Sequence, residues 1–335
     1  MPSTLRDFSL WSSLTLCLVV FSCNQIPTTA HHLQGVALGT TYNIRFASSV
    51  SEQTLQKEID SLLYVLNRSL STYLPQSDIS KINRGDTTVV VDAHFVAVFE
   101  KATEVWKATD GYFDPTVGAL VNAYGFGPEK AINALNPQQK DSLLALTGWQ
   151  KIQLQNDRTL RKESPHIYID FNALAKGYVV DVIGNHLYRR GIRNHLVEIG
   201  GEIVAKGLSP KTSKPWKIAI DDPRQGAQRN FLQTRYLRDR AMASSGNYRK
   251  YRVDPISGQR YVHSINPLSG SAQKTNVLST SVIAPDCMTA DAWATALMVM
   301  PLEKGKALIE NNPHLEALWT LAEKDDFSVV ESKKW

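Results

Sequence analysis

The chain has 335 residues, of which 43% are hydrophobic and 21% are charged. This composition is typical of a globular protein and excludes a disordered or fibrous chain. The net charge is only +5, and basic residues are scattered, with "LYRRG" and "NYRKYR" as the densest stretches. Nucleic-acid binding needs a concentrated basic surface, so no nucleic-acid partner is expected.

The N-terminal segment predicts export. Its apolar run "LWSSLTLCLVVFSC" has about the length of a signal-peptide core and is too short for a transmembrane helix. The run ends with Ser22 before Cys23, which resembles the cleavage site of bacterial lipoproteins. The alternative is an ordinary secretory signal that is cut near Ala30. The expected organisation is a lipoprotein signal peptide over residues 1–22, a lipidated cysteine, an N-terminal tether over 23–37 and one domain over 38–335.

Helical periodicity is clear in four segments of the first half of the chain. In the third segment, Pro137 suits the first turn of a helix and Gly148 suits its end. Two short strands are expected on either side of the turn at 155–159. The four predicted helices span residues 51–70, 92–111, 136–148 and 172–191.

The second half is rich in β-branched residues and in alternating apolar and polar positions, which favour strands. These strands are expected to form one sheet. Because helices and strands do not alternate regularly, the fold class is expected to be α+β. The predicted strands span residues 195–201, 216–222, 260–266 and 278–284.

The segment "IAPDCMTADAWATALMVM", residues 283–300, is expected to form a buried helix. Asp291 and Thr295 are four residues apart, so their oxygens lie on one face of that helix. A lone carboxylate in apolar surroundings is costly, and a hard cation such as magnesium would neutralise it. The alternative is an ion pair with an arginine. Zinc is not expected, because the sequence has no HExxH motif and no Cys/His cluster.

Three other segments place polar residues beside glycines. Residues 111–128, "GYFDPTVGALVNAYGFGP", are expected to form a loop whose aromatic rings line a ligand site or merely seal the core. In "IDFNALAKGY", Asp170 and Lys176 flank a strand-to-helix junction that favours an anion. His263 in "YVHSINP" could transfer a proton, although a lone histidine is more often structural.

Eight motifs occur in order between Leu38 and Met300. They are "LGTTYNI", "LSTYLPQSDISKIN", "GYFDPTVGALVNAYGFGP", "IDFNALAKGYVVD", "VEIGGEI", "SSGNYRKY", "HSINPLSG" and "ADAWATAL". This order resembles that of the FAD:protein FMN transferases, the ApbE family. The resemblance implies an α+β fold with a mixed, largely antiparallel sheet, flanking helices and an FAD cleft between two lobes.

The resemblance also implies an activity: a magnesium-dependent enzyme that splits FAD, releases AMP and links FMN through its phosphate to a threonine or serine of an acceptor protein. The acceptor would be a subunit of an electron-transfer or sodium-pump complex. The enzyme would be lipid-anchored on the periplasmic side of a bacterial membrane, which agrees with the motif at Cys23. Two other classes of function stay open, a magnesium-dependent FAD pyrophosphatase that yields FMN and AMP, and a non-catalytic FAD-binding lipoprotein.

Individual residues receive roles from the same resemblance. The side chains of Asp291 and Thr295 and the backbone carbonyl of Ala173 would hold magnesium. Asp291 and His263 would be catalytic, with His263 as a base or a phosphate-orienting group. FAD would contact Leu38, Tyr73, Tyr112, Phe113, Asp114, Asp170, Lys176 and Ile265.

Overall fold

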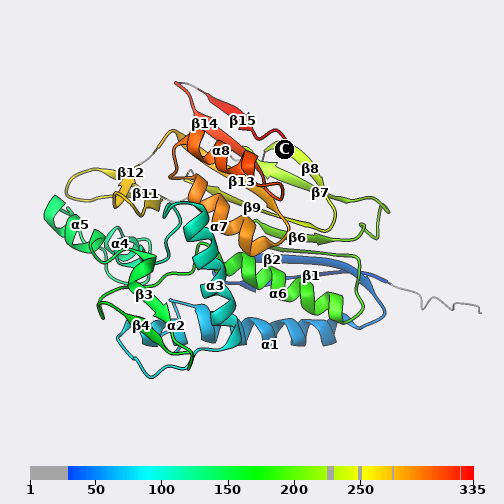
Figure 1. The fold of residues 1–335 in the computed structure, drawn as a ribbon. Coiled ribbons are helices and arrows are strands. Elements are labelled where there is room, and N and C mark those ends of the chain that lie inside the picture. Colours follow the sequence, from blue (N-terminus) through cyan, green and yellow to red (C-terminus); the bar gives the residue numbers. More distant parts are fainter. Residues whose placement is uncertain (1–28, 225–229, 248–250, 274, 325) are drawn as a thin grey trace, which may run out of the picture.

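The computed structural model describes residues 29–224, 230–247, 251–273, 275–324 and 326–335 (Figure 1). Its largest element is an eight-stranded sheet in which all neighbouring strands are antiparallel. The predicted α+β class is therefore confirmed. In sheet order, the strands are Thr29–Ala37 (β1), Thr40–Ser48 (β2), His195–Ile199 (β5), Glu202–Lys206 (β6), Arg240–Gly246 (β9), Val277–Ala284 (β13), Glu316–Ala322 (β14) and Phe327–Glu331 (β15).

The prediction that the later strands form one sheet is wrong. Two of the four predicted segments belong to smaller sheets, because an alternating pattern specifies a strand and its buried face but not its partner. The smaller sheets are Ile152–Leu154 (β3) with Leu160–Lys162 (β4), Trp216–Asp221 (β7) with Phe231–Leu237 (β8), and Tyr251–Val253 (β10) with Arg260–Asn266 (β11) and Ser271–Gln273 (β12).

The five predicted helices are present with shifted ends. The third ends at Leu144 and not at Gly148, because residues 145–147 continue as tight turns. The predicted loop at 111–128 contains a short helix, so that part of the prediction is wrong. The helices are Glu52–Leu70 (α1), Asp78–Asn83 (α2), Ala93–Ala108 (α3), Gly118–Ala123 (α4), Pro137–Leu144 (α5), Ala175–Arg189 (α6), Cys287–Leu297 (α7) and Leu302–Asn311 (α8).

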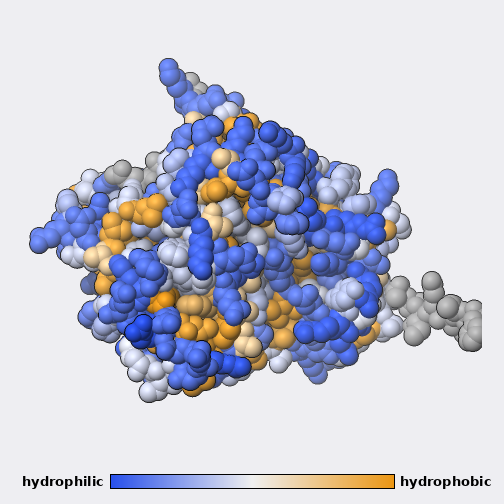
Figure 2. Space-filling model, in the orientation of Figure 1, coloured by the Kyte–Doolittle hydropathy of each residue, from blue (hydrophilic) through white to orange (hydrophobic). Residues whose placement is uncertain are grey.

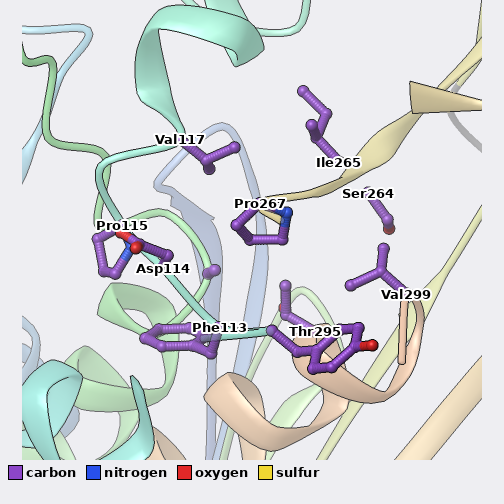
Figure 3. A pocket seen from close by; sticks show the side chains of 11 residues that line it. Phe113, Asp114, Pro115, Val117, Ser264, Ile265, Pro267, Thr295 and Val299 are labelled. Carbon is purple, nitrogen blue, oxygen red and sulfur yellow. The ribbon is translucent and has the colours of Figure 1, made fainter. Parts of the chain in front are cut away.

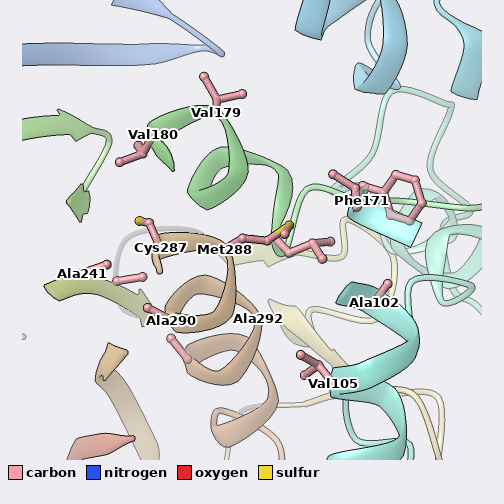
Figure 4. Close-up of a cluster of buried hydrophobic side chains, with 14 of the residues drawn as sticks. Ala102, Val105, Phe171, Val179, Val180, Ala241, Cys287, Met288, Ala290 and Ala292 are labelled. Carbon is pink, nitrogen blue, oxygen red and sulfur yellow. The ribbon is translucent and has the colours of Figure 1, made fainter. Parts of the chain in front are cut away.

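The central sheet is buried on both faces. Alternate residues of its inner strands point to opposite sides: in β13, Val282 packs in the main core with the helices, whereas Ile283 packs in a second cluster with β7 and β8. On the helical side, α6 covers β5 and β6, and α7 covers β9 and β13 (Figure 1). Figure 4 shows α7 enclosed by side chains of α3, α6 and β9. The helix that carries Asp291 is thus central to the core.

The N-terminal boundary differs from the prediction. Residues 29–37 form β1, which pairs with β2 along its whole length, so they are not a tether. The segment has one buried apolar side chain, Leu33, which gives little strand signal in the sequence. Within the described residues, no helix is both long and apolar enough to cross a membrane. Residues 1–28, with the predicted signal peptide and Cys23, lie outside the described part of the chain.

The exposed hydrophobic side chains do not gather on one element. On the face drawn in Figure 2, hydrophobic residues occur in several separate areas between hydrophilic ones. The most exposed of them belong to different parts of the fold, with Val36 in β1, Tyr64 in α1 and Ile256 after β10. Scattered apolar residues of this kind are normal on a protein surface and do not define a docking site.

His195 makes the stability of the fold sensitive to acid. It is fully buried at the start of β5, and its Nδ1 donates to the carbonyl of Ile192 at 2.8 Å. Burial lowers the pKa of His195 to about 4, although this hydrogen bond opposes the shift. The unfolded chain binds a proton near pH 6.5, so stability is complete above that pH and falls as the pH drops towards 4, by up to about 3 kcal/mol.

We therefore expect His195→Asn to lose less stability than the wild type between pH 7 and pH 5. Urea unfolding at both pH values measures the free energy of unfolding that each protein loses between them. This difference does not depend on any loss of stability that the substitution causes equally at both pH values. Equal losses in the two proteins would contradict the assignment.

Candidate functional site

A cavity of about 40 Å³ brings together six residues that the motifs assign to the site. This volume is large enough for only a few water molecules, so only part of a large ligand fits without movement of its walls. Figure 3 shows its three sides: the loop before α4, the end of β11 and the C-terminal half of α7. The predicted residues that line it are Tyr112, Phe113, Asp114, Ala173, Ile265 and Thr295, and the unpredicted ones are Pro115, Val117, Ser264, Pro267 and Val299.

The cavity lies between two hydrophobic clusters. Phe113 belongs to the main core under the central sheet, whereas Ile265 belongs to a smaller cluster formed by α4 and the sheet of β10, β11 and β12. Because, among the described residues, the small sheet shares no hydrogen-bonded strand with the central one, it forms a separate lobe at this point. This arrangement agrees with the expectation of a ligand cleft between two lobes.

Asp114 shapes the loop on one side of the cavity. Its Oδ1 accepts hydrogen bonds from the backbone and hydroxyl of Thr116, and its Oδ2 accepts one from the N–H of Trp149 at 2.9 Å. Burial raises the pKa of Asp114, although these hydrogen bonds oppose the shift. Both oxygens are already occupied, so the visible role of this carboxylate is to fix the loop. The FAD contact predicted for it stays a prediction.

Asp291 lies where α6 and α7 cross. Its side chain is 3% exposed, and its Oδ2 accepts a hydrogen bond from the N–H of Gly177 at 3.0 Å. A Cβ atom at Gly177 would lie only 2.7 Å from the carbonyl carbon of Cys287, so the backbones of the two helices touch here. Among the described residues, no ion pair joins Asp291 to an arginine. The structure therefore does not support the alternative predicted from the sequence, in which an arginine neutralises this carboxylate.

A lysine and a second carboxylate complete this polar centre. Lys176 Nζ lies 2.6 Å from Oε1 of Glu202, which is 2% exposed. Burial opposes the charge of Lys176, but Glu202 and Asp291 outweigh it and raise the pKa of the lysine. Burial also raises the pKa of both carboxylates, and Lys176 opposes both shifts. Two buried carboxylates share one ammonium group, which leaves an excess negative charge that a proton or a cation can neutralise.

Glu202 is a site residue that the sequence reasoning did not single out. It stands in "VEIGGEI", directly after two glycines, and only this position in a motif could have signalled it. Its Oε2 has no hydrogen-bond partner within the described structure. The same turn brings in Leu38, because Gly200 donates to Thr41 at 3.1 Å beside the β1–β2 turn. Leu38 has a positive φ of 53°, which is unusual for a bulky residue, and the following residue, Gly39, also has a positive φ, of 74°.

The remaining predicted residues gather around Phe126, which sequence reasoning also left unassigned. The hydroxyl of Tyr73 donates to the carbonyl of Phe126 at 3.3 Å, and the ring of His263 lies edge-on to the Phe126 ring at 6.3 Å. Asp170 lies near the loop before α4 and near Tyr73. Its N–H donates to the carbonyl of Pro115, and its charge adds to the effect of burial that raises the pKa of Tyr73. His263 and Asp170 thus border the cavity without lining it.

The oxygen donors suit magnesium better than a transition metal. In the described part of the chain, no three or more His, Cys, Asp or Glu residues cluster as a metal site. Thr295 and Ala173 line one cavity, and Asp291 is one helical turn from Thr295. The Thr295 hydroxyl also lies 3.3 Å from that of Ser245. The carboxylate, the hydroxyl and the carbonyl predicted to hold a metal are hard oxygen donors, of the kind that magnesium usually supplements with phosphate and water.

Comparison with known proteins identifies the family. The model of the ApbE family matches residues 38–319. The chain belongs to the ApbE family. The FAD:protein FMN transferase of Vibrio cholerae serotype O1 is 36% identical over 329 residues, which are 96% of this chain and 96% of that relative. The FAD:protein FMN transferase of Haemophilus influenzae is 35% identical over 312 residues, covering 90% of this chain and 89% of that relative.

Solved structures of ApbE proteins share the fold. The flavin transferase ApbE from Vibrio cholerae matches with a TM-score of 0.82 at 36% identity, covering 92% of this chain and 98% of that one. The apo flavinyl transferase ApbE from Pseudomonas stutzeri matches with a TM-score of 0.81 at 30% identity, covering 92% and 96%. The predicted family, fold class and enzyme class, flavin transfer, are confirmed. The roles assigned to single residues stay predictions.

The contact between α6 and α7 should tolerate no side chain. We expect Gly177→Ala to push the helices apart and weaken the hydrogen bond to Asp291, with a loss of roughly 1–3 kcal/mol of stability. Gly184→Ala on the same helix is the comparison, because its new Cβ meets only side chains, Val204 at 2.9 Å and His195 at 3.4 Å, which can shift more easily than the backbone of α7. Urea unfolding of both variants measures the effect, and equal stabilities would show that the crossing is not tightly packed.

Proposed function

We propose that this ApbE-family chain transfers the FMN moiety of FAD to a threonine or serine hydroxyl of an acceptor protein, forms a phosphoester bond and releases AMP with the help of magnesium. The main support is the excess negative charge of Asp291 and Glu202 around Lys176, beside a cavity lined by aromatic rings and oxygen donors. The names of the relatives, FAD:protein FMN transferases, support the reaction class.

Magnesium would be held by the carboxylate of Asp291, the hydroxyl of Thr295 and the carbonyl of Ala173. The fit rests on the burial of a carboxylate whose charge one lysine does not fully balance, and on the hard oxygen donors around it. When bound, magnesium would stabilise the negative charge that develops on the pyrophosphate oxygens. Lys176 would add a fixed positive charge for the same phosphates.

The protein residues would position the reactants and move one proton. Tyr112 and Phe113 offer ring faces on the cavity wall for the flavin. The acceptor oxygen would form a bond to the phosphorus of the FMN half, while the bond from that phosphorus to the oxygen of AMP breaks and its electrons leave with AMP. His263, which immediately precedes the cavity residue Ser264, would accept the proton of the acceptor hydroxyl.

The decisive experiment combines the protein, FAD, magnesium and a candidate acceptor subunit. The proposal predicts flavin fluorescence that stays on the acceptor after denaturation, AMP release that rises when the acceptor is added, and loss of labelling when the acceptor threonine is changed to alanine. AMP release that ignores the acceptor would establish an FAD pyrophosphatase instead. Tight FAD binding without AMP release would establish a non-catalytic flavin-binding protein.

The same assay tests the assigned residues. Asp291→Asn should reduce magnesium-dependent AMP release by roughly 100-fold or more, because magnesium loses its only charged protein ligand. Asp110→Asn is the matched control, since this carboxylate is 65% exposed and pairs with Lys304. His263→Asn should slow transfer by about 10²- to 10⁴-fold. Transfer at the wild-type rate would remove His263 as the base without affecting the reaction class.

We further propose that Cys23 is lipidated and anchors the enzyme on the periplasmic side of the membrane, where its acceptor would be an electron-transfer or sodium-pump subunit. The support is the apolar run that ends in "VVFSC". Wild-type protein should sediment with membranes, and Cys23→Ser should not be processed as a lipoprotein. Fully soluble wild-type protein with an N-terminus near residue 31 would contradict the anchor. Multiple acyl chains are needed for stable attachment.

A further inference from the structure

Asp181 connects α6 to the first turn of α7. Its Oδ1 accepts a hydrogen bond from the N–H of Cys287 and its Oδ2 accepts one from the N–H of Met288, both at 2.8 Å. Asp181 stands one helical turn after Gly177, whose N–H in turn donates to Asp291. Each helix therefore offers a carboxylate to the backbone of the other, so their positions along and around their axes are coupled.

Ordinary capping does not account for this contact. The N-cap of α7 is Asp286, whose side chain already accepts hydrogen bonds from the N–H and hydroxyl of Thr289. Asp181 adds two hydrogen bonds from a different helix, each of 2.8 Å to a backbone N–H. The first turn of α7 is thus held from within by Asp286 and from α6 by Asp181.

We propose that Asp181 is a positioning residue, which holds α7 against α6 and thereby fixes the positions of Asp291 and of Thr295, which lines the cavity. The inference rests on the proposed function in one respect, namely that these two residues hold magnesium. Asp181 itself is too far along α6 to be a ligand, because its two oxygens face the N–H groups of residues 287 and 288. It acts through α7, as groups that orient metal ligands commonly do.

The surroundings of Asp181 permit a chemical test of this role. It lines a second cavity of about 290 Å³, on the N-terminal side of α7, together with Tyr178, Lys206, Asp286 and Met288. Charged side chains stand in its wall, among them Lys101 and Lys206, and the space is large enough for small molecules. A small carboxylate such as formate can therefore enter and replace a deleted Asp181 side chain as the acceptor for the two N–H groups.

The test uses the complete protein with the substitutions Asp181→Asn and Asp181→Ala. Asparagine keeps the size of the side chain but turns an NH₂ group towards one of the two N–H donors. We expect the magnesium concentration for half-maximal AMP release to rise roughly 10- to 100-fold, while the KM for FAD changes less than about threefold. In metal-free protein, the amides of residues 287–297 should exchange hydrogen at least about tenfold faster. Formate should partly restore both properties in Asp181→Ala.

The matched control is Asp92→Ala, which parallels Asp181→Ala. Asp92 caps α3 by accepting a hydrogen bond from the N–H of Phe95 at 2.8 Å, and the same oxygen accepts one from the hydroxyl of Ser69. Alanine removes this acceptor, whereas asparagine would keep it. The variant should therefore lower global stability while leaving the magnesium dependence and the exchange of α7 unchanged. A magnesium shift of equal size in Asp92→Ala would mean that Asp181 contributes only general stability.

The positioning role is overturned if the amides of α7 exchange at the wild-type rate in Asp181→Asn, or if magnesium dependence is unchanged while they exchange faster. Failure of the proposed function looks different. In that case the wild type itself releases no AMP or needs no magnesium, and hydrogen exchange in metal-free protein then decides whether Asp181 holds α7.

Discussion

The backbone contact between α6 and α7 is the constraint on which the site depends. Glycine at position 177 lets the first turn of α6 approach the carbonyl of Cys287, and the N–H of Gly177, which has no partner within α6 because it lies in the first turn, binds Asp291. Because α7 also packs on β9, β13 and α3, it cannot shift to make room for a side chain. The position of one buried carboxylate is therefore set by the packing of the whole helical layer on the sheet, and not by local flexibility.

That packing also concentrates charge. Asp291 and Glu202 are almost completely buried and come from a helix and a strand that are far apart in sequence, while one lysine of α6 lies between them. Water cannot solvate these carboxylates well, so each ionised group depends on Lys176, on backbone N–H groups and on whatever cation binds nearby. Under the proposed function, the fixed negative charge of this centre would attract magnesium and its lysine would attract the phosphates.

The neighbouring walls come from a different part of the fold. Within the described residues, the small sheet that carries His263 and Ile265 shares no strand with the central sheet and packs against the rest of the molecule through side chains. Asp114 fixes the opposite wall by accepting hydrogen bonds from Thr116 and Trp149. Under the proposed function, the metal ligands would lie on the side of the core, and the flavin and the acceptor would meet the side with fewer constraints.

The sequence by itself determined the approximate positions of five helices, including that of Asp291 and Thr295, the α+β class and, through eight ordered motifs, the family. These features depend on local spacing, capping residues and hydrophobic periodicity, which a single chain segment contains. Only the tertiary structure decided that β7 and β11 leave the central sheet, that residues 29–37 form its edge, and that Glu202 and Phe126 join the site. A strand pattern does not encode its partner, and the environment of a side chain arises only when distant segments pack together.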